Sequence, residues 1–255
     1  MKNPAGRRLP LSLPRTLICD VLHFARKVPT VPVERRMHLA EVVAARQKAN
    51  PRPSWVAIFA KAFALVAATR PELRRCYMGF PWPHLYEHPV SVASVAFERR
   101  YRDEDAVLFA PVRRLDTRGL LEIDEKLRYY KTTPVEKVTP FRRALRTARL
   151  PRPLRRFVMW FGLNAWGRKR SHYLGTFGVS VYAGLGAASL HPLSPLTCTL
   201  NYGVIGLDGS VNVRLIYDHR VMDGSTVARA LDEMEGVLKN EILAELRYFE
   251  ALDAA

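Results

Sequence analysis

The sequence predicts a mixed α/β or α+β fold in a single domain, with a sizeable β-sheet covered by helices. Of the 255 residues, 48% are apolar and 25% are charged, as is typical of a globular chain that can bury a core. Segments with helical apolar spacing alternate with glycine-punctuated segments rich in β-branched residues, and no internal repeat is present. This alternation favours helices packed on a sheet.

The first part of the chain is expected to be mostly helical. Helical spacing predicts helices over 16–26, 39–50 and 54–70. Ser54 is a favourable N-cap for the third helix, and apolar residues on nearly all its sides indicate that it is buried. Residues 27–38 contain prolines that oppose helix, so this stretch is expected to be extended.

The rest of the chain is expected to supply most of the sheet. The predicted strands are residues 89–99, 105–115, 175–186, 196–206 and 211–219. An amphipathic helix is predicted over 117–133, and a long helix is predicted to follow Gly224.

The charge of the chain is concentrated in one segment. The net charge is +16, and no acidic residue occurs between Glu136 and Asp208, where eleven lysines and arginines lie. Such a segment suits an anionic partner: nucleic acid, lipid head groups or a phosphorylated cofactor. Residues 1–14 form a basic N-terminal segment that lacks the apolar centre of a secretory signal, and no apolar run is long enough to span a membrane. We therefore expect a cytoplasmic protein.

One turn carries an unusual set of polar residues. The stretch YDHRVMDG places His219 between Asp218 and Arg220, with Asp223 and Gly224 following. An ordinary turn requires Asp or Gly at only one or two positions. The histidine is either a hydrogen-bonded structural residue or a base that the turn holds for chemistry. The other histidines and the three scattered cysteines lack ligand spacing, so no metal site is expected.

This motif resembles the hallmark of the acyltransferase catalytic domains of 2-oxo acid dehydrogenase complexes, their E2 components. Chloramphenicol acetyltransferase shares that fold and a related His-xxx-Asp-Gly motif. The stretch GTFGVS, residues 175–180, is similar to the family's Gly-x-Phe-Thr-[Ile/Val]-Ser segment. The resemblance covers roughly residues 16–136 and 175–245, which leaves residues 138–174 as an insertion in a catalytic domain over 15–255.

The resemblance implies a fold, a mechanism and an assembly. The fold would be a chloramphenicol acetyltransferase-like mixed β-sheet covered by helices. His219 would act as a general base on a thiol, and Ser180 would donate a hydrogen bond to the oxyanion. Asp223 would shape the site, while Asp218 and Arg220 would support it. Family members are trimers in which adjacent subunits contribute the histidine and the serine, so we expect a homotrimer or a multiple of trimers.

The chain also departs from the family. It has no lipoyl domain, so it cannot carry its own lipoyl group, and Gly178 replaces a threonine. We therefore expect a freestanding acyltransferase that uses a coenzyme A (CoA) thioester and no metal. The acceptor would be a thiol, which a lipoyl-carrying protein would supply, or another nucleophile. The alternative is a non-catalytic scaffold of the E2 fold that assembles oligomers, or binds a partner or a membrane surface through its basic segment.

Residues 138–174 allow four interpretations. They could form a surface helix that packs on the domain or on a neighbouring subunit. They could form a lid over an acyl or pantetheine channel, with Arg155, Arg156, Arg168 and Lys169 as candidates to face CoA phosphates. Their aromatic residues between basic flanks also suit a peripheral helix on a membrane surface. Nucleic-acid binding is less favoured, because no recognition module is visible.

Overall fold

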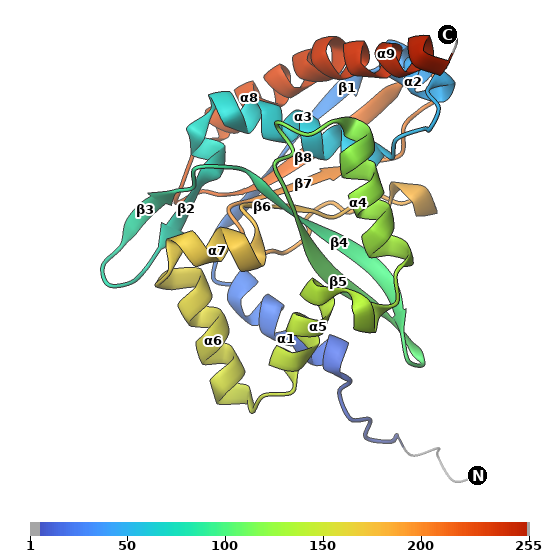
Figure 1. Cartoon of the computed structure of the whole chain (residues 1–255). Coiled ribbons are helices and arrows are strands. Elements are labelled where there is room, and N and C mark those ends of the chain that lie inside the picture. The colour runs from blue at the N-terminus through green and yellow to red at the C-terminus, as the bar shows by residue number, and fades with distance from the viewer. Residues whose placement is uncertain (1–5, 254–255) are drawn as a thin grey trace, which may run out of the picture.

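A six-stranded mixed sheet forms the centre of the structure, a computed structural model that describes residues 6–253 (Figure 1). The strands are β1 (Thr30–His38), β4 (Val92–Tyr101), β5 (Glu104–Arg113), β6 (Phe177–Val179), β7 (Cys198–Tyr202) and β8 (Ser210–Asp218). Their order across the sheet is β1-β8-β7-β6-β4-β5. β6 runs parallel to β4 and β7, and the other pairs are antiparallel. The predicted mixed sheet is confirmed.

One face of the sheet packs on the most apolar helix, α3 (Trp55–Thr69). The Ser54 hydroxyl accepts a hydrogen bond from the Ala57 amide at 3.3 Å, as predicted for the cap. Two aromatic contacts join α3 to the sheet, Phe59 with Tyr202 and Phe63 with Phe177, each with ring centroids 4.2 Å apart. These contacts bury the central strands, because stacked rings remove large apolar areas from water.

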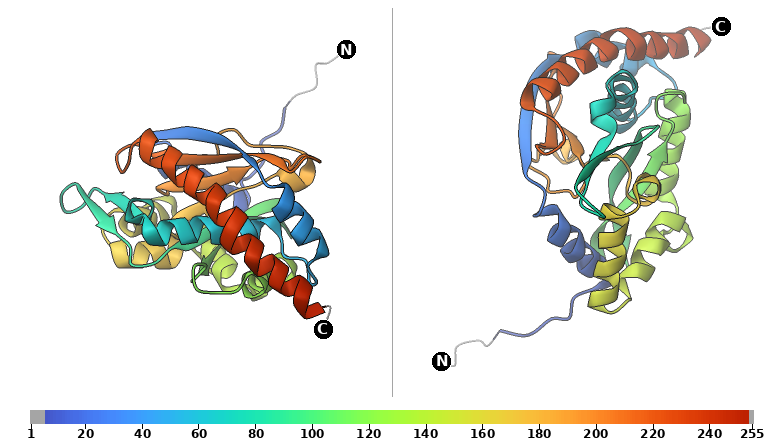
Figure 2. Two further views of the ribbon diagram at one scale, coloured as in Figure 1. Left: turned by 90° about the horizontal axis from the view of Figure 1, so that it is seen from above. Right: turned by 90° about the vertical axis from the view of Figure 1, so that its left-hand side faces the viewer.

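Further helices complete this side of the sheet. They are α2 (Ala40–Lys48), α4 (Leu120–Thr132), α8 (Gly224–Val237) and α9 (Leu243–Asp253). A π-helical turn, Leu238–Ile242, joins α8 to α9, so the predicted long C-terminal helix is nearly continuous. Figure 2 shows α8 and α9 running across the molecule on the side away from α1 and α6.

Four helices lie on the other side of the molecule. They are α1 (Leu13–Ala25), α5 (Thr139–Ala148), α6 (Arg152–Asn164) and α7 (Gly167–Leu174). Figure 1 shows α1, α5 and α6 in the lower part of the molecule, opposite α8 and α9, with α7 above α6. α5 turns Phe141, Leu145 and Ala148 into the core, whereas α6 buries only Leu163. The last three helices are made by the segment predicted as an insertion.

Two regions differ from the sequence-based expectation. A hairpin of β2 (Arg75–Met78) and β3 (His84–Glu87) was not predicted, because these strands are short and prolines interrupt the pattern between and after them. The strand expected over 175–186 is much shorter. It ends at Val179, and a 3₁₀ turn at Ala183–Leu185 follows.

The register of the sheet determines which side chains point away from the core. Ser94 pairs with Gly178, and Gly178 pairs with Thr199. Because side chains alternate along a strand, these three residues share the face opposite α3, while Phe177 and Val179 point into the core. Ser180 is next in this alternation, so the register also turns it away from α3.

Candidate active site

The His219 turn is attached to the end of β8. The Asp218 amide donates to the Thr197 carbonyl at 2.8 Å, and the His219 amide donates to the Pro29 carbonyl at 3.1 Å. These bonds fix the backbone on both sides, while 51% of the His219 side chain is exposed. A histidine on a fixed backbone with a ring accessible to solvent can reach a substrate proton, as a general base requires.

Asp218 is the carboxylate that holds this turn together. Only 3% of Asp218 is exposed, and it accepts hydrogen bonds from the Arg220 amide at 3.0 Å, from Nε at 2.9 Å and from Nη2 at 2.7 Å. The Arg220 guanidinium lies 4.2 Å from the centroid of the Tyr77 ring. The turn is therefore tied to the β2–β3 hairpin, which the sequence did not predict.

A second arginine, Arg170, lies behind this pair and was not singled out from the sequence. It is buried and donates to three carbonyls, those of Tyr77 at 3.1 Å, Leu163 at 2.7 Å and Pro195 at 3.2 Å. Burial lowers the pKa of Arg170, and the charge of Asp218 acts in the opposite direction. Arg170 thus joins α7, α6, β2 and the loop before β7, a role that only the folded chain reveals.

Asp223 and Gly224 lie at the start of α8. The backbone of Asp223 takes the N-cap position, but its side chain makes no capping hydrogen bond and is 81% exposed. Its Oδ1 atom lies 3.7 Å from His219 Nδ1. A Cβ atom at Gly224 would lie 3.3 Å from the Tyr217 hydroxyl, so glycine allows a close approach here. The Asp223 carboxylate therefore lies beside the imidazole and does not cap the helix.

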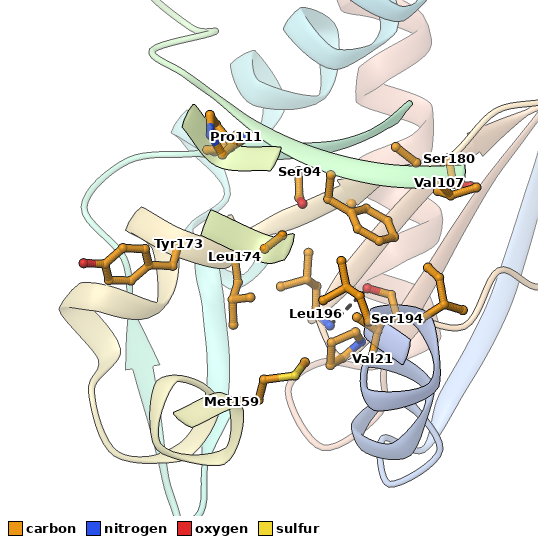
Figure 3. Close-up of a pocket in the computed structure, with 18 of the residues that line it drawn as sticks. Val21, Ser94, Val107, Pro111, Met159, Tyr173, Leu174, Ser180, Ser194 and Leu196 are labelled. Carbon is orange, nitrogen blue, oxygen red and sulfur yellow. Dashed lines mark hydrogen bonds between the residues drawn. The ribbon is translucent and has the colours of Figure 1, made fainter. Parts of the chain in front are cut away.

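Ser180 lies at the wall of a large cavity. The cavity has a volume of about 1040 Å³ and separates the sheet face that carries Ser94, Gly178, Ser180 and Thr199 from α1, α5, α6 and α7. Figure 3 shows Ser94 and Ser180 on the sheet side, facing Val21 of α1 and Met159 of α6. The Ser180 amide donates to the Leu200 carbonyl at 3.2 Å, which fixes its backbone. The volume is at the upper end of the range for small-molecule pockets.

Within one chain, Ser180 and His219 do not meet. Val179 pairs with Leu200 and Leu200 with Leu215, so Ser180 lies level with Arg214, five residues before His219. The separation is therefore about 16 Å along β8 and about 10 Å across two strand spacings. Neither His219 nor Asp223 lines the cavity. If the two residues act together, they must come from different copies of the chain.

The four candidate phosphate ligands have different environments. Arg155 and Arg156 both pair with Asp20 of α1, which is 1% exposed. Arg168 is exposed, and Lys169 lines the cavity. The ion pairs with Asp20 attach α6 to α1, so two of the four candidates already have a structural partner in this chain.

The outer side of α6 is aromatic and exposed. Phe157 is 59% exposed. The centroid of its ring lies 6.3 Å from that of Trp160 and 6.3 Å from that of Phe161. The ring centroids of Trp160 and Phe80 are 5.9 Å apart, so this patch extends to the turn of the β2–β3 hairpin. In that turn, Trp82 is 69% exposed. The segment predicted as an insertion therefore has two functions in the fold: α5 completes the core, while α6 presents aromatic rings to solvent.

The described residues contain neither a metal-binding cluster nor a membrane-spanning helix. Over residues 6–253, no cluster of three or more His, Cys, Asp or Glu side chains is arranged to hold a metal ion. Within the same residues, no helix is both long enough and apolar enough to cross a membrane.

Solved structures show which fold this is, although no protein-family model and no curated protein matches the sequence. Azotobacter vinelandii dihydrolipoamide acetyltransferase, whose catalytic serine, histidine and asparagine have been investigated, superimposes with a TM-score of 0.67 at 18% identity. The match covers 95% of this chain and 94% of that chain. The truncated catalytic core of the Thermoplasma acidophilum 2-oxoacid dehydrogenase complex gives 0.66 at 14% identity, covering 92% and 99%.

Chloramphenicol acetyltransferase matches with a TM-score of 0.51 at 11% identity, over 87% of this chain and 94% of that chain. The protein therefore has the chloramphenicol acetyltransferase-like fold, and it resembles the E2 catalytic cores of 2-oxo acid dehydrogenase complexes. The fold expected from the YDHRVMDG and GTFGVS motifs is confirmed.

Proposed function

We propose that this protein is a CoA-dependent acyltransferase that works as a homotrimer or a multiple of trimers. Each site would combine His219 and Asp223 of one subunit with Ser180 of the next. The proposal rests on one observation. His219 is exposed on a fixed turn and Ser180 lines a cavity, but within one chain the two residues are too far apart to act on the same substrate. A subunit interface is the simplest way to bring these two halves together.

Two features of the solved neighbours support this arrangement. In the Azotobacter enzyme, a histidine and an asparagine four residues apart are studied for catalysis together with a serine. His219 and Asp223 have the same spacing here. One of the matching structures is the cubic core of a pyruvate dehydrogenase multienzyme complex.

The proposed reaction is direct acyl transfer without a covalent enzyme intermediate. His219 removes the proton from the acceptor thiol or hydroxyl as the acceptor attacks the thioester carbonyl. The Ser180 hydroxyl donates a hydrogen bond to the oxygen that becomes negative. The intermediate collapses, the bond from carbon to the CoA sulfur breaks, and the leaving thiolate takes the proton from His219. Asp223, 3.7 Å from Nδ1, stabilises the imidazolium while it carries that proton.

The proposed reaction accepts acceptors of several chemical types. One is a lipoyl group presented by a lipoyl-carrying protein. A free thiol, amine or hydroxyl would use the same base and the same oxyanion donor. An acceptor panel that includes dihydrolipoamide distinguishes these cases.

Substitution of His219 tests the proposal. Turnover of acyl-CoA should fall by about 10²–10⁴-fold in His219→Ala, because a positioned base contributes a factor of that size. Ser180→Ala should lose about 10²–10³-fold, as is typical when one oxyanion donor is removed. Ser225→Ala, an exposed serine of α8, is the matched control and should retain full activity. Full activity of His219→Ala would refute the proposed chemistry.

Mixing the two inactive variants tests the split site. In a trimer that contains both His219→Ala and Ser180→Ala chains, some interfaces join an intact histidine to an intact serine. Random assembly at equal ratio should restore about a quarter of the wild-type activity. If co-refolded mixtures stay inactive while the single variants still assemble, the two residues do not form one site.

The exposed aromatic patch favours a second candidate function, a scaffold that contacts a membrane surface. Trp82, Phe157, Trp160 and Trp166 are exposed, and the last three lie in the segment between Glu136 and Asp208 that has no acidic residue. Aromatic and basic groups together suit the interface of an anionic membrane. Sedimentation with phosphatidylserine vesicles but not with phosphatidylcholine vesicles, abolished in Trp160→Ala/Phe157→Ala, would support this candidate. Full catalysis without such binding would favour the enzyme alone.

A further inference from the structure

The middle of β5 is apolar on both of its faces. One set of alternate residues is buried in the core: Ala106, Leu108, Ala110 and Val112. The residues between them, Val107, Phe109 and Pro111, line the cavity that contains Ser180, and we call these three residues the apolar strip. A sheet with one face on the core commonly turns polar residues outwards on the other face. The outer face of β5 departs from this pattern and requires an apolar cover.

Charged residues limit the apolar strip at both ends. Asp105 precedes it and Arg113 follows it on the same face of β5, and both also line the cavity. From Val107 to Pro111 the strip is about 14 Å long, because strand residues rise by about 3.4 Å each. An apolar surface of this shape suits an extended hydrocarbon chain of limited length.

The cavity leaves room for such a chain beside the strip. The adjoining sheet surface carries small residues: Ser94 and Ala96 of β4 and Gly178 of β6. Figure 3 shows Val21 of α1 and Met159 of α6 on the opposite side of the cavity. Small side chains on one side and apolar side chains on the other form a slot that can hold a flexible apolar group.

Ser180 lies within reach of this slot. β6 is parallel to β4 and in register with it, so Ser180 lies level with Ala96. Ala96 in turn pairs with Phe109, the middle of the apolar strip. Two strand spacings therefore separate Ser180 from the middle of the strip, about 10 Å, and the ends of the strip are about 12 Å away. Three bonds of an extended chain span about 3.5 Å, so these distances correspond to about nine to eleven chain bonds.

We propose that this slot binds the hydrocarbon chain of a medium-chain acyl group of about ten to twelve carbons, with the thioester carbonyl at Ser180. The inference rests on the proposed function and names its donor class, a fatty acyl thioester in place of an acetyl thioester. An acetyl group at Ser180 would not reach the strip. Each methylene group that leaves water for an apolar site strengthens binding by up to about fourfold, so longer chains gain affinity until they fill the slot.

Gly162 of α6 allows the slot to be filled without a clash. It lines the cavity, and a Cβ atom there would have no heavy atom of residues 6–253 within 4 Å beyond its chain neighbours and helix backbone. In Gly162→Phe, kcat/KM for dodecanoyl-CoA should fall by at least about tenfold, while that for butyryl-CoA should stay within about twofold of the wild-type value. Gly236→Phe, at a helical glycine of α8 whose Cβ position is equally open, is the matched control and should change neither value.

The wild-type protein supplies a second test. Its kcat/KM should rise from acetyl-CoA to a maximum at about ten to twelve carbons, because the slot then becomes full. A protein that uses acetyl-CoA as well as it uses dodecanoyl-CoA would have no use for the slot, and the inference would be wrong while the proposed acyl transfer stood.

Binding of inert thioethers separates this inference from the proposed reaction. S-dodecyl-CoA and S-ethyl-CoA carry no transferable acyl group, so calorimetric titration of each into the wild-type protein requires no turnover. Dodecyl binding that is tighter by at least about tenfold, with the difference lost in Gly162→Phe, supports the slot even if no acyl transfer is found. Equal affinities would overturn the inference. A preference for the dodecyl chain that survives Gly162→Phe would also overturn it, because the chain would then bind elsewhere on the protein.

Discussion

The His219 turn and the α5–α7 cover differ in how they are held, although each contributes to the proposed site. The turn depends on buried charges: Asp218 receives three hydrogen bonds from Arg220, and Arg170 binds three carbonyls behind it. The cover depends on the core contacts of α5, on the ion pairs of Asp20 with Arg155 and Arg156, and on Arg170 of α7, which also donates to the Leu163 carbonyl of α6.

This difference matches what each region would do in acyl transfer. A base must be kept within tenths of an ångström of its position, and buried, fully paired polar groups provide such rigidity. A cover must let a carrier arm enter and leave, so a helix with a single buried residue, Leu163 in α6, is suitable. The base and the cover would thus need different degrees of freedom within one site.

The largest stability effect is expected at the turn. Asp218→Asn removes a buried negative charge and leaves Arg220 and Arg170 without their carboxylate, which typically costs about 3–5 kcal/mol. The midpoint of urea unfolding should fall accordingly. Asp103→Asn, at an exposed turn between β4 and β5, is the matched control and should change the unfolding free energy by less than about 0.5 kcal/mol. If the two substitutions had equal effects, the turn would not be held as described.

The turn also shows how far sequence reasoning extends. Local patterns predicted β8, the start of α8 and the residues between them, because neighbours in the chain determine a strand, a turn and a helix start. The resemblance singled out His219 and Ser180 because their motifs are short and contiguous. The support for the turn was not predictable, because Tyr77, Arg170 and Asp218 come from three distant segments that only the fold brings together.

For the basic segment beside the cavity, the sequence predicted the kind of partner but not which residues would face it. The composition of the basic segment predicted an anionic partner, but it did not distinguish Arg155 and Arg156, which pair with Asp20, from Lys169, which lines the cavity. The partner carboxylate lies more than 130 positions earlier in the chain. Short strands such as β2 and β6 were missed or overextended because three or four residues carry too little periodicity.

A smaller loss of folding stability is expected when the pH falls, and it should arise near the residues that support the turn. His88 is buried beside Cys76, with Nε2 3.3 Å from the sulfur, and burial together with Arg170 and Arg74 lowers its pKa from 6.5 to about 4. The folded state therefore binds this proton less readily than the unfolded chain does. The stability that His88 contributes is present above pH 6.5 and is lost as the pH falls towards 4.

Unfolding measured at two pH values tests this coupling. Between pH 7 and pH 5, titration of His88 should cost about 2 kcal/mol. His88→Leu removes the titrating group, so its unfolding free energy should lose that part of the pH dependence. His84→Leu, a partly exposed histidine on the same hairpin, should keep the wild-type slope. Parallel slopes for wild type and His88→Leu would contradict the predicted shift.

The smallest effect on global unfolding is expected at the cover, because there the effect should be local. Asp20→Asn weakens the attachment of α6 to α1 while α5 keeps its core contacts, so α6 can open without unfolding the sheet. Amide hydrogen exchange in α6 should speed up by at least about tenfold, which corresponds to at least about 1.4 kcal/mol of local stability. Exchange in β7 and β8 should not change. Glu98→Gln, an exposed carboxylate on β4, is the control. If Asp20→Asn instead accelerated exchange throughout the sheet, the cover would be part of the same cooperative unit as the His219 turn, and the contrast between a rigid support and a movable cover would fail.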